Sequence, residues 1–157
     1  MPAPSPAHLA HCNEHMLGLS MSRAAELSLV EQGPGRAVTR ARVTPAVTGG
    51  HGGLDGTALY ALLDYTAFLA VVTALDDAES AATHGASFTL TDAAPAGAEL
   101  ELTATLERRG RHVAFLSVRA AWVADGGERT IAFASVTKSV MPMTQRTRPR
   151  TPPSVGG

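Results

Sequence analysis

Alternating apolar and polar residues predict an antiparallel sheet in the second half of the chain. From Ala98 to Glu107, apolar side chains alternate with Glu and Thr, which is the period of a strand with one buried face and one wet face. Gly110 and the pair Gly126-Gly127 lie in turn-forming segments that separate further strand-like runs. The strands expected in this half cover residues 83–91, 98–107, 112–123 and 130–140.

The first half of the chain predicts a hairpin and one long buried helix. Two strand-like runs, 26–30 and 37–43, flank a Gly-Pro-Gly turn. Residues 56–75 contain a single charged side chain, Asp64, and a helix that is apolar nearly all round must be buried. Asp55 stands directly before this helix as a candidate N-cap. The predicted fold class is therefore α+β, with an antiparallel sheet wrapped around one long central helix.

Composition and charge narrow the classes of function. The chain has 157 residues and a net charge of −1, which fits one domain and gives no basic field for nucleic acid. Charged residues make up only 17%, so we expect partner copies of the chain to cover part of the surface. A single cysteine, Cys12, excludes an intrachain disulfide, and residues 1–7 carry no secretory signal. These features predict a cytoplasmic homo-oligomer without a membrane partner.

Asp64 and Gly56 are the candidate chemical groups of the long helix. A carboxylate in the most apolar segment of the chain is costly unless a partner or a function compensates it. It can activate water or attack a carbonyl carbon, and it can also serve only as a hydrogen-bonding group of the structure. The N–H of Gly56, at the positive end of the helix dipole, could stabilise an oxyanion or be a plain helix start. No serine-hydrolase elbow, P-loop or dinucleotide fingerprint occurs.

Three segments, together with the order of elements, resemble the hot-dog-fold acyl-CoA thioesterases of the phenylacetate-degradation (PaaI-like) type. Residues 62–67 are similar to the family's carboxylate segment, 95–97 to its Pro-x-Gly-like turn and 108–111 to its Arg-Arg-Gly-Arg hairpin. The resemblance implies a hot-dog fold, hydrolysis of an acyl-CoA thioester, and a homodimer or homotetramer. The predicted parts of the chain are an N-terminal tail with a short helix (1–18), the hot-dog domain (19–141) and a disordered C-terminal tail (142–157).

The resemblance also implies roles for individual residues. It makes Asp64 the general base or nucleophile and the backbone N–H of Gly56 the oxyanion donor, with the two groups supplied by different subunits. Thr83 falls where relatives keep a Ser or Thr that holds the attacking water, and an ordinary strand residue is the structural alternative. Asp55 falls where the family has histidine, either as a second base or as a helix cap.

Substrate binding is expected from one tyrosine and three arginines. Tyr60 lies one helical turn before Asp64 and could line the acyl pocket, although packing in the core explains it as well. Arg108, Arg109 and Arg111 could hold the phosphates of CoA, because the guanidinium fork matches phosphate, or they could form a solvated turn. No metal or redox cofactor is implied, and CoA enters as part of the substrate.

Two departures from the family pattern keep a second function open. Gly49 stands where the family commonly has Asn, and Asp55 replaces the family's His. The nearby His51-Gly52-Gly53 mimics the family's triplet, but aligning it would insert four residues, so the ungapped register is preferred. The alternative function is a non-catalytic protein that binds acyl-CoA or a small aromatic ligand. A hot-dog dehydratase is disfavoured, because the long helix has no histidine.

Overall fold

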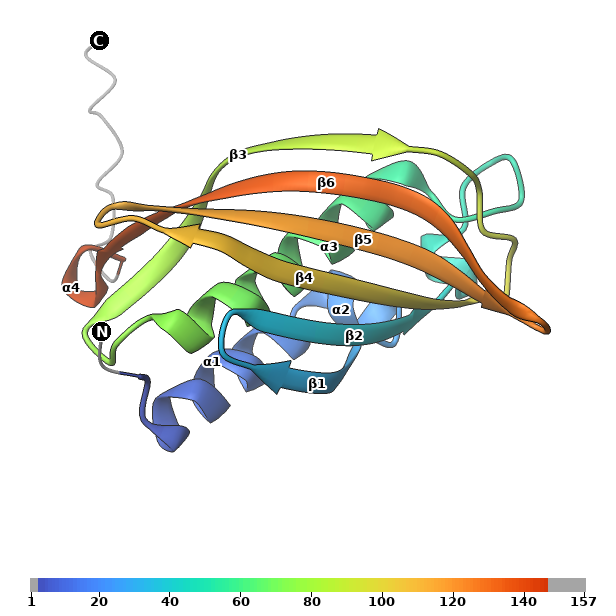
Figure 1. Ribbon diagram of the computed structural model, residues 1–157. Helices are drawn as coiled ribbons and strands as arrows, with labels where there is room; N and C mark the ends of the chain where they lie inside the picture. Colours follow the sequence, from blue (N-terminus) through green and yellow to red (C-terminus); the bar gives the residue numbers. More distant parts are fainter. Residues whose placement is uncertain (1–2, 147–157) are drawn as a thin grey trace, which may run out of the picture.

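The computed structural model describes residues 3–146, whose helices and strands are labelled in Figure 1. The helical segments are α1 (Pro6–Leu17), α2 (Ser20–Ala24), the 3-10 turn η1 (Pro45–Val47), α3 (Gly56–Val71), the 3-10 turn η2 (Val72–Ala74) and α4 (Met143–Arg146). The strands are β1 (Ser28–Gly33), β2 (Arg36–Arg42), β3 (Glu79–Leu90), β4 (Glu99–Arg109), β5 (Val113–Ala124) and β6 (Gly127–Pro142).

These strands form a six-stranded antiparallel sheet in the order β1-β2-β4-β5-β6-β3. The sheet curves around α3, and α1 and α2 lie beside α3 near β1 and β2 (Figure 1). The alternation of β4 is the predicted one, since Leu100, Leu102 and Ala104 are buried and Glu99 is exposed. The predicted α+β class, with an antiparallel sheet around one central helix, is confirmed.

Helix α3 is the centre of the core because apolar residues occupy most of its circumference. Leu62, Leu63 and Leu69 are completely buried. By length and composition the stretch Gly56–Ala74 could cross a bilayer, but 61% of its apolar window is buried inside the fold. The helix predicted over residues 56–75 is present as α3 followed by η2, and its burial is that of a core helix.

One buried hydrogen-bonded pair fixes α3 against the sheet. The hydroxyl of Thr66 donates to the carbonyl oxygen of Leu62 at 2.8 Å and lies 2.8 Å from the hydroxyl of Thr39 on β2. Because the single hydroxyl proton of Thr66 is used within the helix, Thr39 is the donor to Thr66. Both threonines are completely buried. This contact holds the helix on β2 two residues away from Asp64.

A β-bulge at His84 decides which residues of β3 face the helix. Thr83 pairs with Lys138 of β6, whereas Gly85 pairs with the residue before Lys138, so His84 is the extra residue of the bulge. A bulge shifts the alternation of a strand by one position. Thr83 before the bulge and Phe88 after it therefore both contact α3 side chains, which strict alternation would not allow.

Among the predicted boundaries that differ from the structure, two have the same cause, the pairing of β3 with the end of β6. Strand β3 begins at Glu79 rather than at residue 83, and the disorder expected from residue 142 onward does not hold for α4. Strand β6 runs on to Pro142, which pairs with Glu79 at the start of β3. Such a contact between segments far apart in sequence leaves no trace in local composition. Residues 147–157 of the predicted tail lie outside the described residues.

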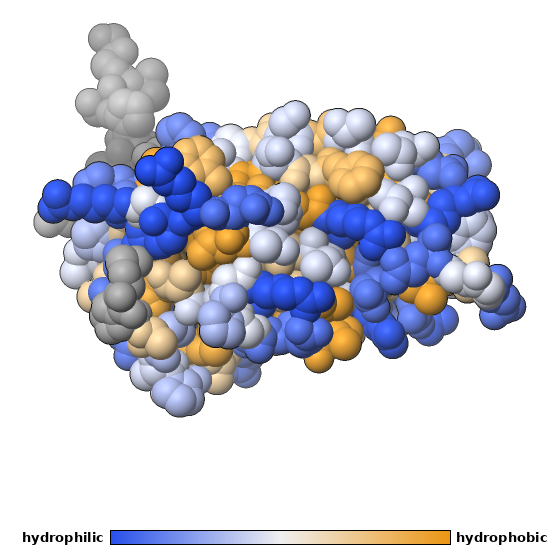
Figure 2. All heavy atoms as spheres, in the orientation of Figure 1, coloured by the Kyte–Doolittle hydropathy of each residue, from blue (hydrophilic) through white to orange (hydrophobic). Residues whose placement is uncertain are grey.

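The outer face of the sheet is a mixed surface. Figure 2 shows hydrophilic residues interspersed with small hydrophobic areas over the side seen in Figure 1. Phe115 of β5 and Phe133 of β6 are about half exposed. Arg119 lies directly opposite Phe133 in the pairing of β5 with β6, so a charged residue is the cross-strand neighbour of this exposed ring.

Candidate active site

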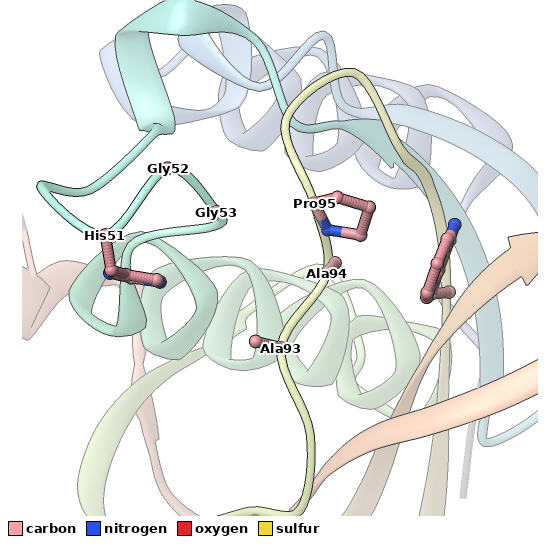
Figure 3. A pocket seen from close by; sticks show the side chains of 7 residues that line it. His51, Gly52, Gly53, Ala93, Ala94 and Pro95 are labelled. Atoms are coloured by element: carbon pink, nitrogen blue, oxygen red, sulfur yellow. The ribbon is translucent and has the colours of Figure 1, made fainter.

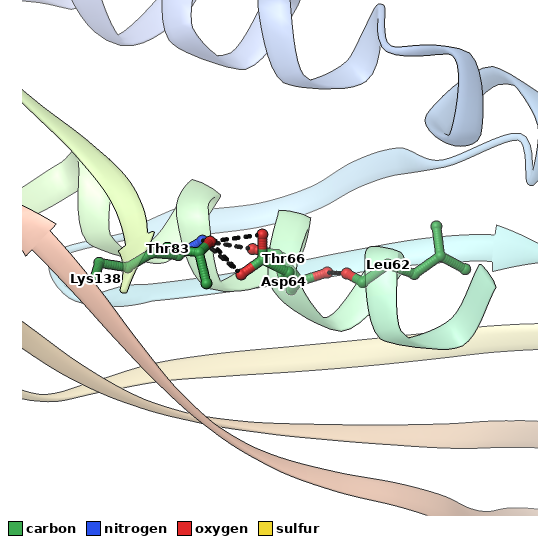
Figure 4. A network of polar contacts seen from close by, with 5 residues as sticks. All are labelled: Leu62, Asp64, Thr66, Thr83 and Lys138. Atoms are coloured by element: carbon green, nitrogen blue, oxygen red, sulfur yellow. Dashed lines mark hydrogen bonds and ion pairs between the residues drawn. The ribbon is translucent and has the colours of Figure 1, made fainter. Parts of the chain in front are cut away.

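Asp64 of α3, Thr83 of β3 and Lys138 of β6 bring their polar groups together (Figure 4). The ammonium of Lys138 lies 2.7 Å from Oδ1 of Asp64 and 2.9 Å from the hydroxyl oxygen of Thr83. That hydroxyl lies 2.8 Å from Oδ1 and 2.9 Å from Oδ2 of Asp64, to which it donates. Three elements that are distant in sequence thus converge on one carboxylate.

The two charged side chains of this cluster differ in exposure. The side chain of Lys138 is 2% exposed, whereas that of Asp64 is 26% exposed. A buried ammonium is tolerated when an anion and hydrogen-bond acceptors compensate the loss of its hydration. Asp64 supplies that anion through Oδ1, while Oδ2 accepts a hydrogen bond only from Thr83 within residues 3–146. Because Oδ2 has no hydrogen bond to the ammonium, it retains acceptor capacity for a water molecule or a substrate.

Lys138 was not among the residues predicted from the sequence, although one signal pointed to it. It is the only lysine of a chain whose Lys and Arg together number 13. In the alternation of β6 it occupies a core-facing position, in phase with the buried Val136 and Val140. A lone lysine at the apolar phase of a strand indicates a buried charge that needs a partner.

Asp55 and Gly56 form the start of α3. Oδ1 of Asp55 accepts hydrogen bonds from the N–H groups of Thr57 at 2.9 Å and Ala58 at 3.1 Å, so the carboxylate acts as the N-cap. The N–H of Leu59 is bonded to the Asp55 carbonyl oxygen. The N–H of Gly56 has no acceptor in the described part of the chain. It is thus the one free donor of the first helical turn described here.

Tyr60 lies between these two ends of the site. Gly56, Tyr60 and Asp64 follow one another at intervals of four residues and so share one face of α3. The Tyr60 ring is stacked on that of Phe88, with centroids 4.5 Å apart and an interplanar angle of 16°. Tyr60 is 38% exposed and Leu90 of β3 is 43% exposed. This face of α3 therefore lies next to apolar side chains of β3. In the single protomer both surfaces are partly exposed to solvent.

The three arginines of the β4–β5 hairpin have different surroundings. Arg109 forms an ion pair with Glu79 at 2.7 Å, and it also donates to the carbonyl oxygens of Gly110 and Arg111. Its side chain is 10% exposed, and its Nε is buried without a partner within residues 3–146. Arg108 and Arg111 are exposed. Two of the three predicted CoA contacts are thus free at the surface, and Arg109 instead ties the hairpin to the start of β3.

The His51-Gly52-Gly53 segment lies in a loop that closes on itself before the helix. The N–H of Gly49 donates to the carbonyl oxygen of Gly53 at 2.8 Å, and that of Gly52 donates to the carbonyl oxygen of Gly49 at 3.0 Å. The loop, residues 93–95 and Trp122 line an open hollow of about 330 Å³, part of which is seen in Figure 3. Helix α3 begins five residues after His51, at Gly56.

Comparison with known proteins relates the fold to thioesterases. No family model and no curated protein match the sequence. A thioesterase family protein from Silicibacter pomeroyi superimposes with a TM-score of 0.78 at 18% identity, over 85% of this chain and 98% of that one. The PaaI protein of the E. coli phenylacetic acid degradation operon superimposes with a TM-score of 0.73 at 19% identity, over 87% and 96%.

A third structure carries a ligand. A hypothetical thioesterase protein from Streptococcus pneumoniae, determined with coenzyme A, superimposes with a TM-score of 0.68 at 20% identity, over 76% of this chain and 90% of that one. Taken with the sheet order and the central helix, these likenesses show that the chain has the hot-dog fold of thioesterase-family proteins. The resemblance to the PaaI-like type is confirmed at the level of the fold.

Proposed function

We propose that this protein is an acyl-CoA thioesterase whose reaction centre is Asp64. The observation that carries the proposal is a partly exposed carboxylate, held through Oδ1 by an ammonium, on the same helix face as a free N–H donor. Thioester hydrolysis needs these two groups, one to generate the nucleophile and one to stabilise the oxyanion. Tyr60 and the apolar side chains of β3 lie beside them and suit the acyl group.

Asp64 can act in either of two ways. As a general base it takes a proton from water while the hydroxide adds to the carbonyl carbon; the C–S bond then breaks, and the CoA thiolate receives the proton. As a nucleophile its Oδ2 adds to the carbonyl carbon and expels the thiolate, and water then hydrolyses the mixed anhydride. In both routes the Gly56 N–H donates to the oxyanion, and Thr83 orients the carboxylate through its hydroxyl.

The distance between the two groups supports a homodimer. Gly56 and Asp64 are eight residues apart, which is about 12 Å along a helix. A reacting carbonyl group must lie about 3 to 3.5 Å from both nucleophile and donor, so one protomer cannot supply both. A second copy of the chain would bring its Gly56 to the Asp64 of the first. Strand β3 is an edge of the sheet, with residues 82–87 exposed, and could pair with its counterpart in that copy.

The remaining features of the proposal concern substrate and location. The Streptococcus pneumoniae structure with coenzyme A supports a CoA thioester as the substrate of this chain. Exposed Arg108 and Arg111 suit the phosphates of its nucleotide end. We place the protein in the cytoplasm, as a dimer or a dimer of dimers, without nucleic-acid or membrane partners and without a cofactor other than the CoA of the substrate.

A binding protein is the second candidate function, because the carboxylate of Asp55 is engaged in capping α3 and Gly49 offers no side chain to a substrate. One experiment separates the two. Thiol release is measured with a panel of aromatic and aliphatic acyl-CoA esters, and binding of the matching non-hydrolysable CoA thioethers is measured by calorimetry. Turnover supports the thioesterase, binding without turnover supports the binding protein, and a lack of both overturns both.

A further inference from the structure

Lys138 has no part in the chemistry proposed above, yet it touches the reacting carboxylate. We propose that Lys138 is a positioning residue that holds Asp64 in one orientation, with Oδ1 fixed and Oδ2 free for the reaction. The proposal rests on the thioesterase function for its kinetic consequences only, because the contact itself can be tested in the absence of turnover.

The geometry of the contact restrains both parts of Asp64. The Lys138 ammonium lies 2.7 Å from the carboxylate oxygen Oδ1 and 3.3 Å from the main-chain carbonyl oxygen of the same residue. One group that contacts the side chain and the backbone of a residue together limits rotation of the side chain between them. Thr83 adds a further restraint, since its hydroxyl accepts from Lys138 at 2.9 Å and donates to the carboxylate.

The identity of the residue fits this role. An ammonium is a compact charge with three donors that radiate from one atom, whereas the donors of a guanidinium lie in one plane. Among the contacts of Lys138, three acceptors surround its nitrogen within hydrogen-bonding distance: Oδ1 and the carbonyl oxygen of Asp64, and the hydroxyl of Thr83. Of the 13 Lys and Arg residues of the chain, this position alone has lysine.

Burial alone does not make the ammonium of Lys138 a source of fold stability. Its side chain is 2% exposed and lies in phase with apolar residues of β6. Replacing a buried ion pair by apolar residues of similar volume is often neutral or stabilising. A methionine would fill the same position, so the ammonium is better explained by what it does to Asp64 than by packing.

The first test is the steady-state kinetics of Lys138→Met. We expect kcat to fall between about tenfold and a hundredfold, because a misplaced reacting group costs rate of this order. KM and the Kd of the CoA thioether should stay within about twofold, since the Lys138 side chain is 2% exposed and would act on the substrate only through Asp64. Ile131→Val is the matched control, a completely buried residue of the same strand outside the cluster, and its kcat should not change. An unchanged kcat in Lys138→Met, or a parallel change in the control, would overturn the proposal.

The second test needs neither turnover nor a folded lysine variant. Because Lys138 is the only lysine, protein labelled with [15N]lysine gives a single side-chain Nζ resonance. In the wild type we expect a slowly exchanging Nζ–H₃ signal that moves in Asp64→Asn. A signal lost to rapid exchange in the wild type, or one unmoved by Asp64→Asn, overturns the positioning role. If the wild type hydrolyses no thioester while this signal behaves as expected, the proposed function fails and the contact stands.

Discussion

Replacing Asp64 by asparagine should destabilise the fold more than replacing Lys138 by methionine. The first change leaves the 2% exposed ammonium with a neutral partner in place of its anion. Breaking a buried ion pair in this way costs about 3 to 5 kcal/mol, and because Asp64 is 26% exposed we expect the lower end, about 3 kcal/mol. Against a total stability of about 5 to 15 kcal/mol this is a large loss.

Lys138→Met removes the buried charge itself and leaves a carboxylate that water can reach and to which Thr83 still donates. We expect a cost of about 1 kcal/mol, the net value of one lost hydrogen bond. The double variant contains no buried charge, so its loss should be smaller than the sum of the two single losses by about 2 kcal/mol.

Urea unfolding followed by circular dichroism measures the free energy of unfolding of the wild type, the two single variants and the double variant. They are compared at one protomer concentration, because the stability of the proposed homo-oligomer would depend on that concentration. Two results would refute the reasoning: an Asp64→Asn variant as stable as the wild type, or single losses that add up in the double variant. Either would mean that the ammonium does not depend on the Asp64 charge.

Three further predictions concern contacts outside the Lys138 pair. Thr66→Val leaves the buried Thr39 hydroxyl without its acceptor, so it should lower the free energy of unfolding by about 1 to 3 kcal/mol, as measured by thermal unfolding. This loss should exceed that of Thr39→Val, and equal losses in the two variants would contradict the donor assignment. Asp55→Ala removes the cap of α3 and should cost about 1 kcal/mol, whereas Asp55→Asn should retain most of it. The backbone N–H of Ser5, and then its hydroxyl, lower the pKa of the Asp77 carboxyl. Stability from this contact is therefore present above the ordinary Asp pKa and is lost as pH falls through the lowered one. Urea unfolding of the wild type and Asp77→Asn should show a difference at neutral pH that disappears in acid, and a difference that stays the same at both pH values would exclude the contact.

Local patterns predicted the elements whose own residues carry the signal. The helix was predictable because one charge, Asp64, occurs in residues 56–75, and a helix of that kind can only be buried. Strand β4 was predictable because strict alternation fixes which face is wet. Asp55 as the cap of α3 followed from its residue type and its place before the helix.

Features that depend on pairing between distant segments were not predictable in this way. The bulge at His84 arises only when β3 pairs with β6. A prediction from strict alternation, which takes no account of the bulge, would put Thr83 and Phe88 on opposite faces of the strand. Lys138 joined the site because β6 lies next to β3 over α3, which its own neighbours in sequence do not show. The ion pair of Arg109 with Glu79 likewise engages a residue that the family resemblance and its residue type had assigned to CoA.

The most direct test of Asp64 as the reaction centre is thioester hydrolysis by the wild type and by Asp64→Asn. Both are assayed with the acyl-CoA ester that the wild type turns over fastest, at a temperature where unfolding curves show each to be folded. We predict that kcat falls by about a hundredfold or more in the variant, as expected for the loss of a general base or nucleophile, while the CoA thioether still binds. Undiminished turnover by a folded Asp64→Asn protein would contradict the account and move the chemistry to another group.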